Sequence, residues 1–445
     1  LNALSIKVGK GKGTWREQGK RTDLAVQRPW LKSYGKYTPI TCPIPKQPLH
    51  KFLEAATDRI PKRIATIFYG STLTYQQLDR RVNQFAHALH GLGVRPGDRV
   101  MIVMPNMPQM IIAYYATLKI GGVVVLPNPD AKAVQIVEQV EETSAKVLVT
   151  LKDFAGLANK VQEKNDVKIV LANIRDVVSG RVYKELLGRW NAAGFGEEEI
   201  PWVDEGQTME SLMLDAPKTR PEIEVDSGAM ANILFTSGTT DEPKGVCLTH
   251  ENLVANALQT RHWIPDVRYG QEVFLSVLPL THSYGMTTAM NIPIVIGATI
   301  VLLPVFEIQQ VLDHIKEYKP SVFPGVPSIY AAINHAPNVR DYGLNSIKAC
   351  ISGAAPLPVE VQEAFQKLTR GRLVEGYGLT EASPVTHANP LRGEAKTGSI
   401  GIPIPNTDAK IVDLVKGKDL PPGQIGELLV RGPQVMKGYW QAEGK

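Results

Sequence analysis

The chain has 445 residues, of which 43% are hydrophobic and 21% charged, with 38 Gly and 32 Pro. This composition is typical of a globular protein with a large core, and it excludes a disordered, collagen-like or disulfide-scaffold chain. The net charge of +5 comes from the N-terminal arm, because residues 1–37 carry nine Lys and Arg against Glu17 and Asp23. The remaining chain is slightly acidic, which argues against nucleic-acid binding.

The cysteines, the longest apolar stretch and the basic arm indicate the cellular compartment of the protein. Cys42, Cys247 and Cys350 lie far apart and in no CxxC pair, so neither a disulfide framework nor a zinc ribbon is expected. The longest apolar stretch, 292–306, contains Pro and Gly and is shorter than a bilayer span. We expect a cytoplasmic protein, whose arm either contacts an anionic membrane surface peripherally or is a solvated tail.

From about residue 48, helical and strand patterns alternate. Thr74 followed by Gln77 predicts a capped helix that continues through Leu89 and ends at Gly91 and Gly93. Buried strands are expected over 100–104, 123–126 and 147–150, with helices over 109–119 and 134–142. This alternation predicts an α/β fold with a mainly parallel sheet.

The second half of the chain begins after a less regular segment. Residues 173–226 are more polar and less periodic, which predicts an insertion or connector. Strands are then expected over 273–278, 299–303, 321–323 and 349–352, and helices over 308–318 and 359–368. The short strands 410–413 and 427–431 favour a small β-barrel. The predicted organisation is a basic arm (1–47), paired α/β subdomains (48–388) and a β-barrel subdomain (389–445).

A loop rich in hydroxyls and glycine joins two predicted strands, 232–235 and 246–248. Its sequence, TSGTTDEPKG (236–245), offers backbone N–H groups, hydroxyls and one ammonium to a polyanion such as a triphosphate. It differs from the nucleotide loop of strand-to-helix NTPases, because Pro243 precedes Lys244 and no Gly-Lys-Ser/Thr opens a helix.

Four motifs in order carry a family resemblance. TSGTTDEPKGV (236–246), SGAAPLP (352–358), EGYGLTEASP (375–384) and GELLVRGPQVMKGYW (426–440) resemble those of the adenylate-forming (AMP-binding) superfamily. This family includes acyl-CoA synthetases, peptide synthetase adenylation domains and beetle luciferases. The resemblance implies two stacked α/β subdomains and a small β-barrel, and it covers residues 48–445. The family continues past the segment that matches 438–440 to a hinge and a small domain with a lysine, so we expect the large N-terminal domain only, without that small C-terminal domain.

The resemblance also implies an ATP site. Lys244, Thr380, Glu381 and His282 would be catalytic, with Thr380 at the α-phosphate and Glu381 holding Mg²⁺ together with Thr236. The β- and γ-phosphates would lie on Thr236, Ser237, Gly238, Thr239, Thr240 and Lys244, and the adenine slot would consist of Gly353, Ala354, Ala355, Glu375, Gly376, Tyr377 and Gly378. A surface role for Glu381 and a core role for Tyr377 are the alternatives. Asp241 stands where the family usually has Gly, and we expect its side chain to point outward.

The segment THSYG (281–285) resembles the family's acyl pocket. The resemblance implies acyl-binding roles for His282, Tyr284 and Gly285 on one wall and for Gly325 and Val326 on the other. No Asp occurs in 279–290 to hold an ammonium, so the substrate is expected to lack an α-amino group. Met286, Met290, Ile292 and Ile294 fit either an apolar tunnel or ordinary core, and His282 fits either a substrate ligand or a hydrogen-bonded buried histidine.

The implied activity is that of an acyl-CoA synthetase. It would use ATP, Mg²⁺ and coenzyme A to activate a medium- or long-chain fatty acid as acyl-AMP, releasing pyrophosphate and then AMP. The alternatives are an aryl-acid CoA ligase, an acyl-AMP ligase that loads a carrier protein, and a noncatalytic nucleotide- or acyl-binding module. The sequence leaves open whether the protein is a monomer or a homodimer.

Overall fold

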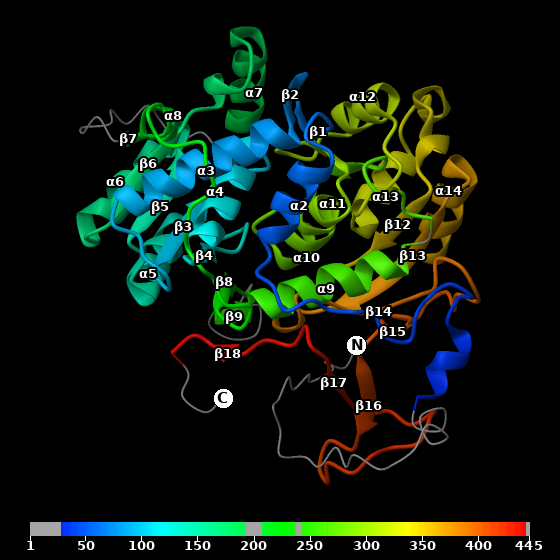
Figure 1. The fold of residues 1–445 in the computed structure, drawn as a ribbon. Coiled ribbons are helices and arrows are strands. Elements are labelled where there is room, and N and C mark those ends of the chain that lie inside the picture. The colour runs from blue at the N-terminus through cyan, green and yellow to red at the C-terminus, as the bar shows by residue number, and fades with distance from the viewer. Residues whose placement is uncertain (1–27, 193–206, 237–242, 265, 442–445) are drawn as a thin grey trace.

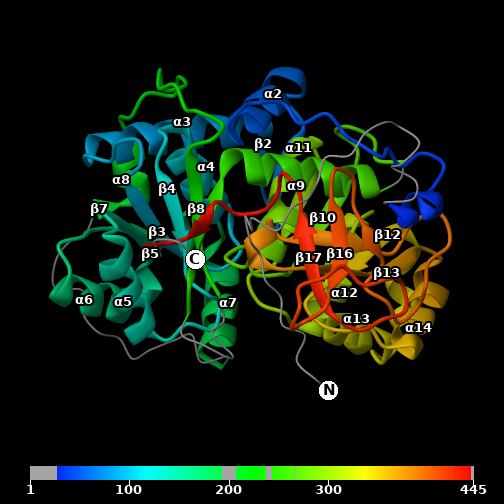
Figure 2. The same cartoon turned by 90° about the horizontal axis from the view of Figure 1, so that it is seen from below.

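The computed structural model describes residues 28–192, 207–236, 243–264 and 266–441. Its helices and strands form two lobes that lie side by side (Figures 1 and 2). Helix α9 (His250–Trp263) follows the first lobe's strand β9 (Gly245–Thr249) and packs on α11 (Ile292–Val295) of the second lobe. Among the described residues, no helix combines the length and apolarity that crossing a membrane requires.

The first lobe is built on an eight-stranded sheet of order β18-β9-β8-β4-β3-β5-β6-β7. Its pairs are parallel except β8–β9 and β9–β18, which are antiparallel. The other strands are β3 (Arg99–Val103), β4 (Val123–Leu126), β5 (Val147–Leu151), β6 (Lys168–Ala172), β7 (Gln207–Thr208), β8 (Met230–Phe235) and β18 (Gly438–Tyr439).

Helices cover both faces of this sheet because each strand is apolar on both sides. Val100 and Ile102 pack with α3 (Tyr75–Gly91) and α4 (Pro108–Lys119), whereas Met101 packs with α5 (Ala133–Thr143) and α6 (Ala155–Lys164). Successive strand residues point to opposite faces, so this alternation produces two separate layers of core. The predicted parallel α/β arrangement is confirmed, and the helices and strands expected between 100 and 150 are present within one residue at each end.

The predicted capping of α3 is also confirmed. The Thr74 hydroxyl accepts from the Gln77 backbone N–H at 3.2 Å, and the Gln77 side chain accepts from the Thr74 N–H at 2.8 Å. This reciprocal pair satisfies two N–H groups that would otherwise lack partners at the start of the helix. The helix then buries Leu78, Val82 and Leu89 completely.

The second lobe contains two four-stranded sheets. Their orders are β10-β11-β1-β2 and β12-β13-β14-β15. The strands are β1 (Ile64–Phe68), β2 (Ser71–Thr74), β10 (Val273–Ser276), β11 (Thr299–Leu302), β12 (Ala349–Ser352), β13 (Arg372–Gly378), β14 (Val385–Ala388) and β15 (Ile402–Pro403). The helices of this lobe are α2 (Lys51–Arg59), α10 (Ser283–Gly285), α11, α12 (Ile308–Tyr318), α13 (Pro327–Asn334) and α14 (Val359–Thr369).

One predicted strand of the second lobe does not form as a regular strand. The strand expected over 321–323 is reduced to bridges in which Val322 joins Phe274 to Ala349, and it thereby links the two sheets of the second lobe. Residues 173–226, predicted as an insertion or connector, contain α7 (Gly180–Ala192), α8 (Met209–Met213) and β7, which extends the large sheet.

The C-terminal strands differ from the expected β-barrel in their pairing. The predicted strands are present as β16 (Asp408–Val412) and β17 (Glu427–Arg431), which form an antiparallel hairpin. The other strands of residues 389–441, β15 and β18, pair with β14 and β9 respectively. The short strands of this region are thus distributed over separate sheets: β15 and β18 each extend a sheet of one lobe, whereas β16 and β17 form a two-stranded sheet of their own.

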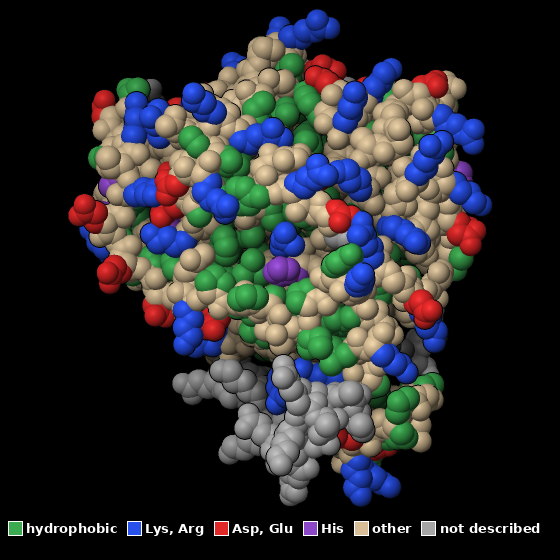
Figure 3. All heavy atoms as spheres, turned by 45° about the vertical axis from the view of Figure 1, so that its right-hand side comes forward, with side chains coloured by type: hydrophobic (Ala, Val, Ile, Leu, Met, Phe, Trp, Pro, Cys, Tyr) green, Lys and Arg blue, Asp and Glu red, His purple; other side chains and the backbone are tan. Residues whose placement is uncertain are grey.

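Asn106 joins the two lobes next to the site described below. Its side chain follows β3, accepts from the Leu280 N–H at 2.9 Å and donates to the Leu278 carbonyl at 2.9 Å. All three residues are at most 5% exposed. The three cysteines are free thiols and are buried. On the face seen in Figure 3, Lys and Arg side chains are scattered among acidic and apolar ones.

Candidate active site

The hydroxyl-rich loop begins and ends at a pair of residues that bond to each other. The Thr236 N–H donates to the Lys244 carbonyl, and the Lys244 N–H donates to the Thr236 hydroxyl, both at 3.1 Å. These bonds continue the β8–β9 ladder by one step, so the ends of the loop are fixed by the large sheet. Ser237, Gly238, Thr239, Thr240 and Asp241 lie outside the described residues, so their predicted roles stay predictions.

Thr380 and Glu381 begin the short 3-10 helix η7 (Thr380–Ala382), directly after β13. The Thr380 hydroxyl lies 3.3 Å from that of Ser283, at the start of α10. The Glu381 carboxylate Oε1 accepts from the Tyr439 hydroxyl at 2.9 Å. These contacts bring together residues from the chain's middle and its C-terminal strand.

His282 lies just before α10 and is half-buried. Its Nδ1 accepts from the backbone N–H of Tyr284 at 3.1 Å. Burial lowers the pKa of His282, and the more distant Asp130 charge opposes that effect only partly. The ring is therefore neutral near pH 7, and because Nδ1 accepts, its proton resides on Nε2, which is available as a donor.

Thr236, Thr380 and Glu381, which sequence reasoning placed at the phosphates and the metal, line one cavity of about 240 Å³, here called the central cavity. Its lining includes Thr236, His282, Ser283, Thr380 and Glu381. The sequence separates these residues by up to 145 positions, and the structure brings them together where the two lobes meet. Lys244 is exposed at the end of the loop and is not among the residues that line this cavity.

A second cavity of about 220 Å³, here called the slot, adjoins the central cavity and shares His282, Ser283, Leu379 and Thr380 with it. Gly353, Ala354, Gly376, Tyr377 and Gly378 of the predicted adenine site line it as well. A side chain at Gly353 would place its Cβ 3.0 Å from the Tyr284 ring, and one at Gly376 would lie 2.7 Å from Ile351. A side chain larger than hydrogen at either position would therefore clash with a residue that lines the slot.

The other two predicted members of the adenine site do not line the slot. Glu375 instead accepts from the Leu357 N–H at 3.2 Å, and burial raises the pKa of Glu375. It thereby holds the turn that follows Gly353. Ala355 is exposed next to Ala354, whose backbone φ of +67° lies in the left-handed region that L residues rarely adopt.

The predicted acyl-binding residues are only partly close to these cavities. Tyr284 lines the slot, and its hydroxyl donates to the Ile351 carbonyl at 2.5 Å. Gly285 is buried where a Cβ would lie 2.2 Å from the Pro279 carbonyl oxygen, so it permits a close backbone approach. Gly325 and Val326 line neither cavity, and Met286, Met290 and Ile294 are fully buried in the core.

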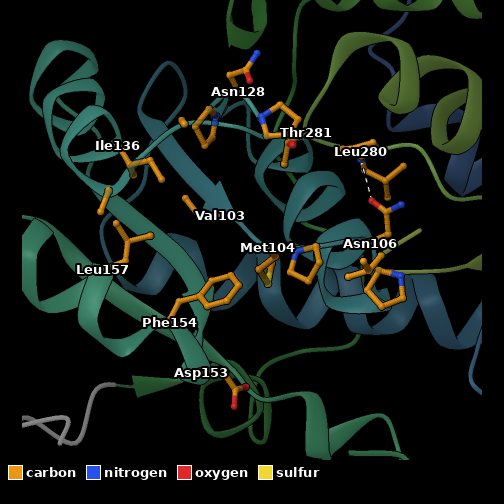
Figure 4. Close-up of a pocket in the computed structure, with 18 residues that line it drawn as sticks. Val103, Met104, Asn106, Asn128, Ile136, Asp153, Phe154, Leu157, Leu280 and Thr281 are labelled. Carbon is orange, nitrogen blue, oxygen red and sulfur yellow. Dashed lines mark hydrogen bonds between the residues drawn. The ribbon is translucent and has the colours of Figure 1, made fainter. Parts of the chain in front are cut away.

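A third cavity, of about 280 Å³ and mostly apolar, was not found by sequence reasoning (Figure 4). We call it the side cavity. It shares Asn128, Pro129 and Thr281 with the central cavity and extends past Phe154 and Leu157 between β3 and helices α5 and α6. Its residues come from the ends of strands and from helix starts, which carry no motif that a single sequence could reveal.

One polar atom in the side cavity lacks a partner. Asp153 Oδ1 accepts from the Tyr183 hydroxyl at 2.9 Å, whereas Asp153 Oδ2 is buried without a hydrogen bond in the structure. A buried acceptor without a partner is energetically costly.

The residues near the central cavity fit Mg²⁺. Thr236 and Glu381 supply a hydroxyl and a carboxylate, which are hard oxygen donors. No cluster of three or more His, Cys, Asp or Glu that could hold a metal occurs in the described part of the chain. This sparse donor set suits an ion that keeps several waters and binds substrate phosphates, as Mg²⁺ does.

Comparisons with known proteins agree with this geometry. Residues 53–440 match the family described as AMP-binding enzyme. The chain is 39% identical over 422 residues to the long-chain-fatty-acid–CoA ligase of Bacillus subtilis (strain 168), covering 93% of this chain and 74% of that protein. It is 33% identical to 4-coumarate–CoA ligase 2 of Nicotiana tabacum, covering 88% and 69%.

A solved structure has the same fold. A long-chain-fatty-acid-CoA ligase from Archaeoglobus fulgidus superposes with a TM-score of 0.76 at 24% identity, covering 92% of this chain and 79% of that one. The match of residues 53–440 to the family model and the 39% identity to a curated relative establish that this chain belongs to the AMP-binding enzyme family.

Proposed function

We propose that this protein is an ATP-dependent acyl-CoA synthetase that acts on medium- or long-chain fatty acids. The observation that carries the proposal is the convergence of Thr236, His282, Thr380 and Glu381 on the central cavity, between the slot and the side cavity. The similarity to a bacterial long-chain-fatty-acid–CoA ligase supports the substrate class.

The chemistry explains why this reaction needs no acid–base triad. A carboxylic acid is already ionised at neutral pH, so its oxygen can attack the α-phosphorus and displace pyrophosphate without a general base. The difficulty is to bring one anion to another, which requires oriented donors where negative charge develops. The hydroxyls of Thr236, Thr380 and Ser283 supply such donors, and the Lys244 ammonium supplies charge at the end of the loop. Mg²⁺, held by Glu381 and the Thr236 hydroxyl, would neutralise charge on the phosphates.

His282 is suited to orient the acyl group rather than to remove a proton. Its neutral ring has Nδ1 engaged by the Tyr284 N–H, so Nε2 donates. His282 lines both the slot and the central cavity. A donor at this boundary can hold a carboxylate oxygen during adenylation and the acyl carbonyl oxygen when a thiol attacks.

We assign the side cavity to the arm of coenzyme A. The CoA sulfur must approach the acyl carbon from a side that AMP does not occupy, and the side cavity enters the central cavity away from the slot. Its lining combines apolar side chains with Asn128 and Thr281, which suits an arm with both methylenes and amides. Sulfur then bonds to the carbonyl carbon, AMP departs, and the thiol proton passes to solvent.

An aryl acid is the second candidate substrate. The 33% identity to a 4-coumarate–CoA ligase favours it specifically, and the side chains in the slot and central cavity do not distinguish the two acid classes. Both candidates share the same nucleotide and thiol chemistry.

The test is pyrophosphate release with ATP and Mg²⁺ across acetate, octanoate, palmitate, 4-coumarate and several amino acids, with and without CoA. We expect acyl-CoA formation that peaks on octanoate or palmitate. A peak on 4-coumarate would establish the second candidate, and no release with any acid despite ATP binding would leave a noncatalytic module. Glu381→Gln should lower the rate at least about 100-fold. The matched control Glu210→Gln changes a carboxylate on α8 that pairs with Arg81 of α3, and its rate should equal that of the wild type.

A further inference from the structure

Residues 433–440, here called the strap, cross from η7 to the large sheet. The strap is fastened at both ends by hydrogen bonds of 2.7–2.9 Å: Ser383 Oγ donates to the Gln434 carbonyl, the Met436 N–H donates to the Glu381 carbonyl, and the Trp440 N–H donates to the Gly245 carbonyl. Between these attachments β18 pairs with β9, with Tyr439 opposite Val246. The strap therefore holds Tyr439 next to Glu381 of η7 and next to Lys244 at the end of the hydroxyl-rich loop.

Tyr439 contacts both of these residues. Its hydroxyl donates to Glu381 Oε1 at 2.9 Å, and the Lys244 Nζ lies 5.9 Å from the centre of its ring. The single hydroxyl proton can point to only one acceptor, so this bond selects one orientation of the Glu381 carboxylate. The ring face meanwhile attracts the ammonium by a cation–π interaction.

Resting on the proposed function, we propose that Tyr439 is a positioning residue that orients the Glu381 carboxylate for Mg²⁺ and supports Lys244 at the polyphosphate. Among the described residues we propose only Glu381 and Thr236 as protein ligands of the metal, so the orientation of this one carboxylate should contribute strongly to its affinity. Groups that hydrogen-bond to metal ligands commonly change metal affinity by about 10–100-fold. The two contacts of Tyr439 are separable, since the hydroxyl serves the carboxylate and the ring serves the ammonium.

The experiment measures metal and nucleotide binding directly. Mn²⁺ replaces Mg²⁺, and its binding to the protein–ATP complex is followed by electron paramagnetic resonance, while ATP binding in EDTA is measured by calorimetry. Tyr439→Phe removes only the hydroxyl, and we expect Mn²⁺ to bind about 10-fold more weakly with less than a twofold change in metal-free ATP affinity. Tyr439→Leu also removes the ring and should weaken both.

Tyr69→Phe is the matched control, because it also removes a hydroxyl bonded to a side chain, Gln310, at 2.6 Å. It should leave both affinities at wild-type values. Unchanged Mn²⁺ affinity in Tyr439→Phe would overturn the proposal, and so would a loss of metal-free ATP binding in Tyr439→Phe equal to that in Tyr439→Leu. If the wild type binds neither ATP nor Mn²⁺, the proposed function fails and the role of Tyr439 fails with it.

Discussion

Acid should destabilise this protein because several histidines are buried in the neutral form. Burial lowers the pKa of His50 to about 2 and the pKa values of His250 and His387 to about 4, and in His50 the neighbouring His250 adds to the effect. In the unfolded chain the same rings titrate near pH 6.5. Below that pH the unfolded state binds protons that the folded state does not, so stability falls as pH decreases.

The size of the effect follows from these values. At pH 5, each of the three histidines should lower the free energy of unfolding by about 2 kcal/mol relative to pH 7.5, or by about 6 kcal/mol together. Domains are usually stable by only about 5–15 kcal/mol, so much of the stability would be lost. Asp and Glu side chains in model peptides titrate near pH 4. Most carboxylates should therefore add little to the change in stability above pH 5.

The assay is urea unfolding followed by circular dichroism at pH 7.5, 6 and 5. The variant His250→Gln can retain the acceptor for the Leu49 N–H, which lies 3.2 Å from His250 Nδ1. We expect it to lose about 1 kcal/mol less than the wild type between pH 6 and pH 5. His335→Gln changes an exposed ring and serves as the control, with a wild-type pH dependence. Equal losses in the wild type and His250→Gln would refute the reasoning.

Three further predictions concern the Asn106 bridge between the lobes, the slot and the side cavity. Asn106→Ala should destabilise the protein by about 2–4 kcal/mol in urea unfolding, because it leaves the buried Leu280 N–H without a partner; a loss below about 1 kcal/mol would show that the lobes do not depend on this bridge. Gly353→Val should weaken ATP binding at least about 10-fold by calorimetry, since even its Cβ would lie 3.0 Å from the Tyr284 ring; wild-type affinity would contradict the adenine assignment. Leu157→Trp should fill the side cavity and raise the KM for CoA at least about 10-fold without changing pyrophosphate release in the absence of CoA; a selective loss of long-chain adenylation would instead assign this cavity to the acyl chain.

Regular elements could be predicted from the sequence wherever periodicity and end signals agreed. Helix α3 combined a capping box at Thr74 with buried positions at helical spacing, and helix α12 was predicted over its full length, Ile308–Tyr318. The strand predicted over 321–323 is not a regular strand. Val322 instead forms single bridges to its two neighbours in space, Phe274 and Ala349. Strand β7 was missed because its two residues have no pattern of their own and form only on an existing sheet edge.

The candidate site likewise contains residues that could be predicted from the sequence and residues that could not. Thr236, Thr380 and Glu381 lie in contiguous motifs, so the sequence could identify them, and the structure brings them to one cavity. Gly325 and Val326 resembled an acyl wall, but they line neither of the cavities that contain His282. The side cavity and the contacts of Tyr439 depend on how distant segments pack. No local spacing encodes such packing.

The pairing of β18 with β9 also has a consequence for synthesis on the ribosome. Strand β9 lies between β8 and β18, and β18 emerges roughly 190 residues later than β9, or about 10–40 s at ordinary elongation rates. During that interval one edge of β9, next to the loop of the ATP site, has no partner from its own chain. An open strand edge can pair with another nascent chain, so this edge is where we expect premature termination or slowed translation downstream of β9 to cause aggregation.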